Sequence, residues 1–300
     1  MVRSRMTILR RAELAAVRFA AERIDALVAA IDINDRIDLD AALPTTVRLH
    51  YPAERFVEGF ALSRQLWREG FDPPALTALA IRLKGGGQLD ADTGRWFKQV
   101  RARFKHLRFA FFLYAAGHRS PAMLSLVTLV MGELQDAVRV RHARDVARHA
   151  ARLQLLLSRP ARLLLAHEVD RLVPSDAAAF RRFTVSQIAS LAPLLATPVT
   201  GAHAFHAARK VVSRQVSFHD DMRTLNPYGE QAVEHRAMAR WLATLNGLMG
   251  QFHDELVTQN AAGTFRYARD TFALPEDIRA RLEALVPLYL ATRSSNPPSA

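Results

Sequence analysis

The stretch Phe97–Val138 begins Phe97-Lys98-Gln99-Val100-Arg101-Ala102-Arg103-Phe104-Lys105-His106-Leu107-Arg108 and ends Met131-Gly132-Glu133-Leu134-Gln135-Asp136-Ala137-Val138. A degraded copy at Phe205–Val257 begins Phe205-His206-Ala207-Ala208-Arg209-Lys210 and ends Met249-Gly250-Gln251-Phe252-His253-Asp254-Glu255-Leu256-Val257. Each copy has the pattern of a basic helix followed by an apolar helix that ends in Met-Gly-x-x-x-Asp. A helical unit of this size needs a neighbour to bury its apolar side. The repeat therefore predicts an all-α fold, a helical bundle of two degenerate halves.

Basic side chains recur at helical spacing in both copies. In the first copy, Lys98, Arg101, Lys105 and Arg108 follow the spacing i, i+3, i+7, i+10, which is one face of a helix. In the second copy, His206, Arg209, Lys210 and Arg214 fall within about 140° of one another at about 100° per residue. Cations gathered in one groove repel each other, so such a groove would bind a polyanion. The alternative, which the sequence leaves open, is a pair of solvated helix faces neutralised by carboxylates from elsewhere.

The two copies resemble the CHAD family, helical proteins built from two similar halves around a basic cavity. The resemblance is carried by His206-x-x-Arg209 and Met249-Gly250-x-x-x-Asp254, and by Lys98-x-x-Arg101 and Met131-Gly132-x-x-x-Asp136. It covers Trp96–Arg159 and Ala202–Asn260, and it departs from the motif where Lys98 replaces a histidine and Ser213 replaces a further basic residue. The resemblance implies non-catalytic binding of inorganic polyphosphate or another phosphate-rich polyanion.

Charge and composition limit the class of protein. The formal net charge is +12 and half of the residues are hydrophobic, which indicates a folded protein with an acidic partner. No cysteine is present, which excludes disulfides, thiolate metal sites and a cysteine nucleophile. No apolar run is long enough to span a bilayer. The expected location is the cytoplasm, with association to a granule and the oligomeric state left open.

Three regions are expected along the chain. They are an N-terminal helical region (1–87), a repeat domain (88–291, with halves at about 96–159 and 202–260) and a disordered tail (292–300). Lys84-Gly85-Gly86-Gly87 marks the first boundary, and Trp96–Ala116 is the expected first basic helix. Whether residues 1–87 complete the first half or form a separate helical cap stays open. Thr45–His50 is the one stretch with the pattern of a strand.

Further charged residues have candidate roles beside the two basic faces. Arginines recur every three to four residues along an expected continuation of the helix beyond Arg139, where they would extend the anion surface: Arg141, Arg144, Arg148 and Arg152. The alternative is a solvent face with Asp136 and Asp145 as partners. We expect Asp136 and Asp254 to stay off the ligand, each pairing with an arginine of a basic helix. Gly132 and Gly250 are expected to allow a close approach between helices.

Other functions compete with polyanion binding. A nucleic-acid backbone would suit the same groove. A metal-dependent phosphohydrolase would use His203-x-x-His206 with His219-Asp220-Asp221, but its remaining ligands cannot be placed. A scaffold that pairs its apolar helices with a partner is the third alternative. We expect no catalytic residue, no metal and no cofactor.

Overall fold

The computed structural model describes residues 8, 9, 11–229 and 231–292. The fold is all-α, as predicted, apart from an antiparallel pair of two-residue strands, β1 (Thr200–Gly201) and β2 (Thr271–Phe272). The contacts divide the chain into a first unit, Met1–Ile24 with Ala53–Ser175, and a second unit, Asp25–Pro52 with Asp176–Ala300. Helix α2 (Ala21–Asp32) contains the point of division. The disordered tail expected at 292–300 lies outside the described residues except for Thr292.

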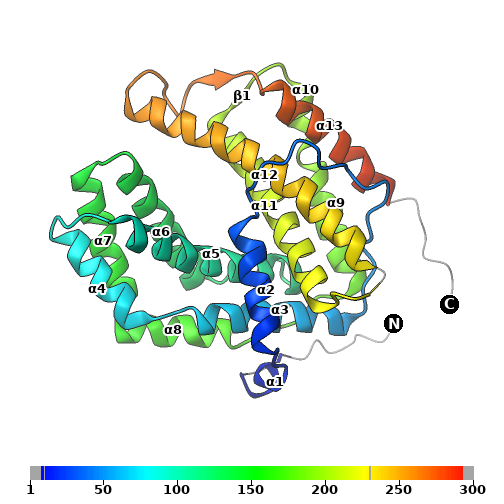
Figure 1. Cartoon of the computed structure of the whole chain (residues 1–300), viewed down its shortest axis with the longest axis horizontal. Coiled ribbons are helices and arrows are strands. Elements are labelled where there is room, and N and C mark those ends of the chain that lie inside the picture. Colours follow the sequence, from blue (N-terminus) through cyan, green and yellow to red (C-terminus); the bar gives the residue numbers. More distant parts are fainter. Residues whose placement is uncertain (1–7, 10, 230, 293–300) are drawn as a thin grey trace. The chain divides into compact units, whose positions relative to one another are not determined.

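In the first unit, helices pack both on their neighbours in sequence and on more distant helices. Helix α3 packs against α5, α4 against α7, and α6 against α5, α7 and α8 (Figure 1). The bounds are α1 (Arg11–Ala16), α3 (Ala53–Glu69), α4 (Pro73–Lys84), α5 (Ala91–Tyr114), α6 (Ala122–Arg139), α7 (Ala143–Leu156) and α8 (Arg159–Val169). Residues 53–84 therefore belong to the first unit.

Aromatic rings and a buried ion pair hold the first unit together. The ring of Phe60 contacts that of Phe111 edge to face, with 4.8 Å between centroids. Both Nε and Nη2 of Arg64 donate to Oδ1 of Asp170, at 3.0 and 2.6 Å, and both residues are buried. Since Asp170 follows α8, this pair joins the end of the unit to α3.

The basic helix α5 begins earlier than the sequence pattern indicated. The carboxylate of Asp90 accepts a hydrogen bond from the backbone N–H of Thr93, at 2.7 Å, and so caps the helix at Ala91 rather than near Trp96. Its apolar side is buried, including Val100, Phe104 and Leu107. The basic residues therefore lie on the opposite, more exposed side.

The expected continuous helix beyond Arg139 is wrong. Helix α6 ends at Arg139, and α7 starts at Ala143. Arg141 has a φ of 55°, and the N–H groups of Arg141 and His142 donate to the carbonyls of Val138 and Ala137. This is a Schellman ending, with an arginine in the left-handed position that glycine usually occupies.

The second unit is centred on two long helices. Helix α11 (Ala202–Leu225) lies beside α12 (Gln231–Ala261) (Figure 1). Helix α13 (Glu276–Ala291) packs against α9 (Ala177–Ala189), α10 (Ala192–Ala196) and α12. The strand pair β1–β2 joins the start of α11 to the segment before α13.

A segment without helix or strand, residues 33–52, is bound along α12. Asn246 donates to the carbonyl of Asn34 at 2.8 Å, and Thr244 exchanges hydrogen bonds with the backbone of Asp38 at 3.1 and 3.0 Å. Gly247 makes this approach possible, because a β-carbon there would lie 2.2 Å from the carbonyl oxygen of Asp35. The segment is held by helix side chains rather than by a sheet.

The strand expected at Thr45–His50 is wrong, because this stretch has no strand pairing in the structure. The alternation of apolar and polar residues in this stretch corresponds to alternating burial of the side chains. Val47, Leu49 and Tyr51 are buried, and the residues between them are exposed. The ring of Tyr51 packs edge to face on Phe218, with 5.5 Å between centroids.

A buried polar chain crosses the core of the second unit. Nδ1 of His219 lies 2.8 Å from Nδ1 of His235, and its Nε2 lies 3.2 Å from the hydroxyl of Tyr289. Nε2 of His235 lies 3.2 Å from the hydroxyl of Tyr51. Burial, and then the neighbouring His235, hold the pKa of His219 well below its ordinary value of 6.5. His219 is therefore a neutral core residue at physiological pH.

We predict that Gly247→Ala lowers the free energy of unfolding by about 2 kcal/mol, because the new β-carbon meets backbone atoms that cannot rotate away. Gly94→Ala, in α5, is the matched control. Beyond the adjoining backbone of its own helix, no described atom lies within 4 Å of the added β-carbon, so the substitution should stabilise by about 0.5–1 kcal/mol through helix propensity. Urea denaturation of both variants gives the comparison, and equal effects would contradict the role of Gly247.

We also predict that His219 makes stability depend on pH. In the unfolded chain His219 binds a proton below about pH 6.5, whereas the folded chain keeps it neutral. The free energy of unfolding should therefore fall as the pH drops below about 6.5, and His219 should account for about 1.4 kcal/mol per pH unit of this fall. Above about pH 7, His219 should make no contribution to the pH dependence. Denaturation of His219→Gln from pH 8 to pH 5 should show a flatter profile than the wild type. The exposed His50→Gln should keep the wild-type slope, and an unchanged slope in His219→Gln would refute the assignment.

Candidate functional site

The first predicted basic face lies on one helix, α5. This helix carries six Lys and Arg residues and one acidic residue, Asp92. Lys98 is exposed, whereas Arg101, Lys105 and Arg108 are half-buried. The Nε atoms of Arg101 and Arg108 are buried, so packing limits the rotation of these side chains.

Arg101 lies against a glycine of the next helix. A β-carbon built on Gly132 in α6 would be 3.2 Å from Nη2 of Arg101 and 3.6 Å from its Nε. Gly132 is buried. The glycine thus leaves room for the guanidinium beside the backbone of α6.

Arg209 has the same neighbour in the second unit. A β-carbon on Gly250 in α12 would lie 2.7 Å from Nη2 and 3.3 Å from Cζ of Arg209. Real β-carbons do not approach other atoms so closely, so any side chain at Gly250 would displace the guanidinium. In both units, therefore, the glycine of Met-Gly-x-x-x-Asp accommodates the arginine of the basic helix. We expected each glycine to allow two helices to approach closely, and in the structure it is a guanidinium group that approaches the glycine.

Arg108 sits in an environment that disfavours its charge. Burial lowers the pKa of Arg108 from its ordinary value of 12.5. Its Nε is buried and makes no hydrogen bond to any described atom. The guanidinium carbon lies 5.9 Å from the ring centroid of Phe112, a weak cation–π contact. A bound anion would restore part of the solvation that Arg108 has lost.

The start of α11 contributes to a group of aromatic residues, which we name the histidine cluster: His203, His206, His253 and Tyr267. The rings of His206 and His253 stack with 4.8 Å between centroids and 29° between planes. Nε2 of His253 lies 3.0 Å from the hydroxyl of Tyr267. His203 meets the edge of Tyr267 at 5.3 Å. The stacked pair brings the expected site residue His206 together with a histidine of α12.

The second basic face is more buried at its far end. Arg209 and Lys210 are half-buried, and Arg214 is 8% exposed. Nη2 of Arg214 donates to the side-chain carbonyl of Gln187 in α9. Arg214 therefore joins α11 to α9, and the more accessible cations of this face are those nearest the start of the helix.

The expected arginine extension is distributed over a turn and a helix. Arg141 lies in the turn before α7, and Arg144, Arg148 and Arg152 lie on α7, all four exposed. Arg148 pairs with Asp145 at 2.8 Å, and Arg152 pairs with Glu133 of α6 at 3.1 Å. Two of the four arginines are therefore neutralised by local carboxylates. The alternative of a solvent-exposed face predicted such a role for Asp145.

The two motif aspartates have different neighbours. Asp136 forms an ion pair with Arg139, three residues on in its own helix. Oδ1 of Asp254 lies 3.6 Å from Nδ1 of His253. Sequence reasoning left His253 and Tyr267 out of the site. His253 could have been found from its place beside Asp254 in the motif, whereas nothing in the sequence marked Tyr267.

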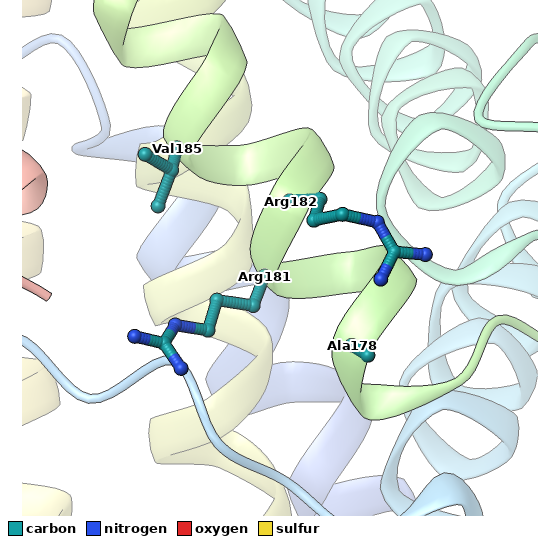
Figure 2. Close-up of a pocket in the computed structure, with 4 residues that line it drawn as sticks. All are labelled: Ala178, Arg181, Arg182 and Val185. Atoms are coloured by element: carbon teal, nitrogen blue, oxygen red, sulfur yellow. The ribbon is translucent and has the colours of Figure 1, made fainter. Parts of the chain in front are cut away.

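A separate pocket of about 330 Å³ lies on α9. Figure 2 shows Ala178, Arg181, Arg182 and Val185 along it, with the two guanidinium groups extending in different directions from the helix. None of these four residues was predicted as a site residue.

Among the residues that the structure describes, no group of three or more His, Cys, Asp or Glu side chains is placed to hold a metal ion. In particular, His219 is committed to the buried chain with His235 and Tyr289. Of the helices formed by residues 11–229 and 231–292, none has the length and apolar character to cross a membrane.

Comparison of the chain with models of known protein families, with curated proteins and with solved structures finds no match.

Proposed function

We propose that the protein binds inorganic polyphosphate, or a similar phosphate-rich polyanion, without catalysis. The observation that carries the proposal is the placement of Arg101 on Gly132 and of Arg209 on Gly250. An arginine whose stem is half-buried against a helix loses less freedom when its guanidinium binds a ligand. Its planar fork matches two phosphate oxygens at once.

The charge around each arginine supports an anionic ligand. Helix α5 has an excess of basic over acidic residues, and the first half of α11, through Arg214, contains no acidic residue. Desolvation of Arg108 adds a further cation that a phosphate oxygen would stabilise. The resemblance to the CHAD family, which stays a proposal, leads to the same ligand.

The choice of polyphosphate over nucleic acid rests on the aromatic residues. A single-stranded nucleic acid gains affinity by stacking bases on exposed rings beside the cations. Lys105 lies 5.4 Å from the ring centroid of Phe109, but that ring is 2% exposed. Phe109 therefore offers no face to a base, and Phe112, beside Arg108, is half-buried, so phosphate contacts would carry most of the binding.

The test is the affinity for fluorescently labelled long-chain polyphosphate, measured by anisotropy with single-stranded DNA as competitor. We predict that the double variant Arg101→Ala/Arg209→Ala loses at least about tenfold in affinity, since each charged hydrogen bond contributes about 1.5–3 kcal/mol. The control is Arg119→Ala/Arg236→Ala, which removes the same charge from exposed positions, one in each unit. An equal loss of affinity in the control variant would show that the effect comes from the lower net charge and not from these two arginines. No binding by the wild type at low salt would refute the function.

We extend the proposal to a single ligand shared by both basic faces, the groove that the repeat predicts. The stoichiometry of long-chain polyphosphate decides between one shared site and two separate ones. With one shared site, Arg101→Ala and Arg209→Ala each weaken the whole binding event. With separate sites, each single variant keeps one site of full affinity, and that result would overturn the shared groove.

The two glycines provide a further prediction. A β-carbon at Gly250 comes 0.5 Å closer to its arginine than one at Gly132, 2.7 Å against 3.2 Å, so Gly250→Ala should weaken polyphosphate binding more than Gly132→Ala. The atoms displaced are the ends of flexible side chains, and alanine favours a helix over glycine by about 1 kcal/mol. The free energy of unfolding should therefore change by less than about 1 kcal/mol in both variants. Equal affinity losses, or a large loss of stability, would show that the glycines do not act through the guanidinium groups.

A further inference from the structure

Helix α8 presents leucines to solvent on the side opposite its buried residues. Leu163 is 64% exposed and Leu164 is 49% exposed, whereas Leu165 and Val169 are buried. At about 100° per residue, the exposed pair lies on the far side of the helix from the buried pair. Leu155, near the end of α7, is 72% exposed and adds a third leucine shortly before α8. Isolated exposed leucines are ordinary on protein surfaces, so it is their grouping that needs a cause.

Arginines stand among these leucines. Arg159 lies one turn before Leu163, Arg162 is its neighbour in sequence, and Arg171 follows the helix. Nη1 of Arg171 lies 3.2 Å from Nε2 of His167, an exposed residue one turn after Leu163, so Arg171 lies on the same side as the leucines. Among the described residues, no carboxylate forms an ion pair with any of these three arginines.

The acidic residues of the stretch 159–171 are engaged by other helices. Glu168 accepts a hydrogen bond from the backbone N–H of Met123 at 3.0 Å and so caps the start of α6. Asp170 is buried in its ion pair with Arg64 of α3. This stretch contains no other acidic residue. Its exposed arginines and leucines are therefore left to a partner that is both anionic and apolar.

The mixture of leucines and arginines favours a lipid surface over a protein partner. Protein interfaces concentrate apolar and aromatic side chains at a centre that is depleted of charge. Helix α8 instead alternates Arg159, Leu163 and His167 along one face, and it contains no Phe, Tyr or Trp. A helix that lies on a membrane has such a face, because leucines enter the boundary of the acyl chains while arginines reach the lipid phosphates. An anionic leaflet also attracts each cation near its surface.

We propose that α8 and its flanking residues bind the surface of an anionic lipid bilayer. Leu163 and Leu164 enter the boundary between headgroups and acyl chains, and Arg159, Arg162 and Arg171 pair with lipid phosphates. The binding is peripheral, since α8 has 11 residues and a spanning helix needs about 20. The surface is separate from the basic faces of α5 and α11, so this inference goes beyond the proposed function and does not depend on it.

The experiment is cosedimentation of the whole protein with vesicles at low salt. One set of vesicles is phosphatidylcholine alone, and in the other about a third of the lipid is phosphatidylglycerol. The wild type should sediment with the anionic vesicles and remain in the supernatant with the neutral ones. Leu163→Ser/Leu164→Ser should weaken this binding by at least about fivefold, because both leucines lose their apolar contact with the lipid. The matched control is Leu39→Ser/Val233→Ser, which removes two comparably exposed apolar side chains from the second unit and should bind like the wild type.

Arg159→Ala/Arg171→Ala is a second variant that leaves the leucines in place. It should weaken binding to the anionic vesicles by about tenfold, since each arginine near the surface is attracted to anionic lipid. Arg119→Ala/Arg236→Ala removes the same charge from exposed positions elsewhere and should have a smaller effect. Equal losses in the two variants would show that net charge alone draws the protein to the vesicles, and this would overturn the inference.

The variant Arg101→Ala/Arg209→Ala separates the lipid surface from the proposed polyanion site. It should keep its binding to anionic vesicles. Vesicle binding that needs these two arginines, or that is unchanged in Leu163→Ser/Leu164→Ser, overturns the inference. A wild type that does not sediment with anionic vesicles also overturns it and leaves an acidic protein as the partner of α8. None of these outcomes contradicts the proposed function, which is decided by the affinity for polyphosphate.

Discussion

The contact between a guanidinium and the bare backbone of a neighbouring helix is the constraint on which the basic faces of this protein depend. A side chain larger than hydrogen at Gly132 or Gly250 would occupy the space where Arg101 or Arg209 lies. The arginines gain a fixed position from this contact at the cost of partial desolvation. Each guanidinium is thus held by packing against the backbone of the neighbouring helix.

The two units surround this contact differently. In the first, α5 carries its cations above an aromatic core, and the buried polar groups include the Arg64–Asp170 ion pair. In the second, the core itself is polar along the chain from Tyr51 through His235 and His219 to Tyr289. Low dielectric makes such chains costly unless every member is hydrogen-bonded, so they fix one arrangement of the helices around them. The second unit therefore combines a hydrogen-bonded histidine pair in its core, His219 with His235, with a second, stacked pair, His206 with His253.

The helices and their apolar sides could be predicted to a large extent. Local chemistry determines them: the side chain of Asp176 caps α9, and the period of the apolar residues marks the buried side. The cap by Asp90 at the start of α5 was missed, so that helix was predicted to begin too late. The errors have equally local causes. Helix α6 is followed by an arginine with positive φ, Arg141, at a position that glycine usually occupies. The residues before Tyr51 alternate in burial as a strand does, but they have no strand partner. A positive φ is uncommon for arginine, and an extended stretch can exist without a strand partner.

The sequence by itself determined the all-α class, the two basic faces and the pairing of each with a Met-Gly-x-x-x-Asp segment, because charge spacing and helix period are properties of neighbouring residues. Only the tertiary structure decided what those glycines accommodate, that α4 packs on α7, and that His253 stacks on His206 beside Tyr267. Such contacts join residues far apart in the chain. Their geometry depends on how side chains of different helices fill a common volume, and no local pattern records that.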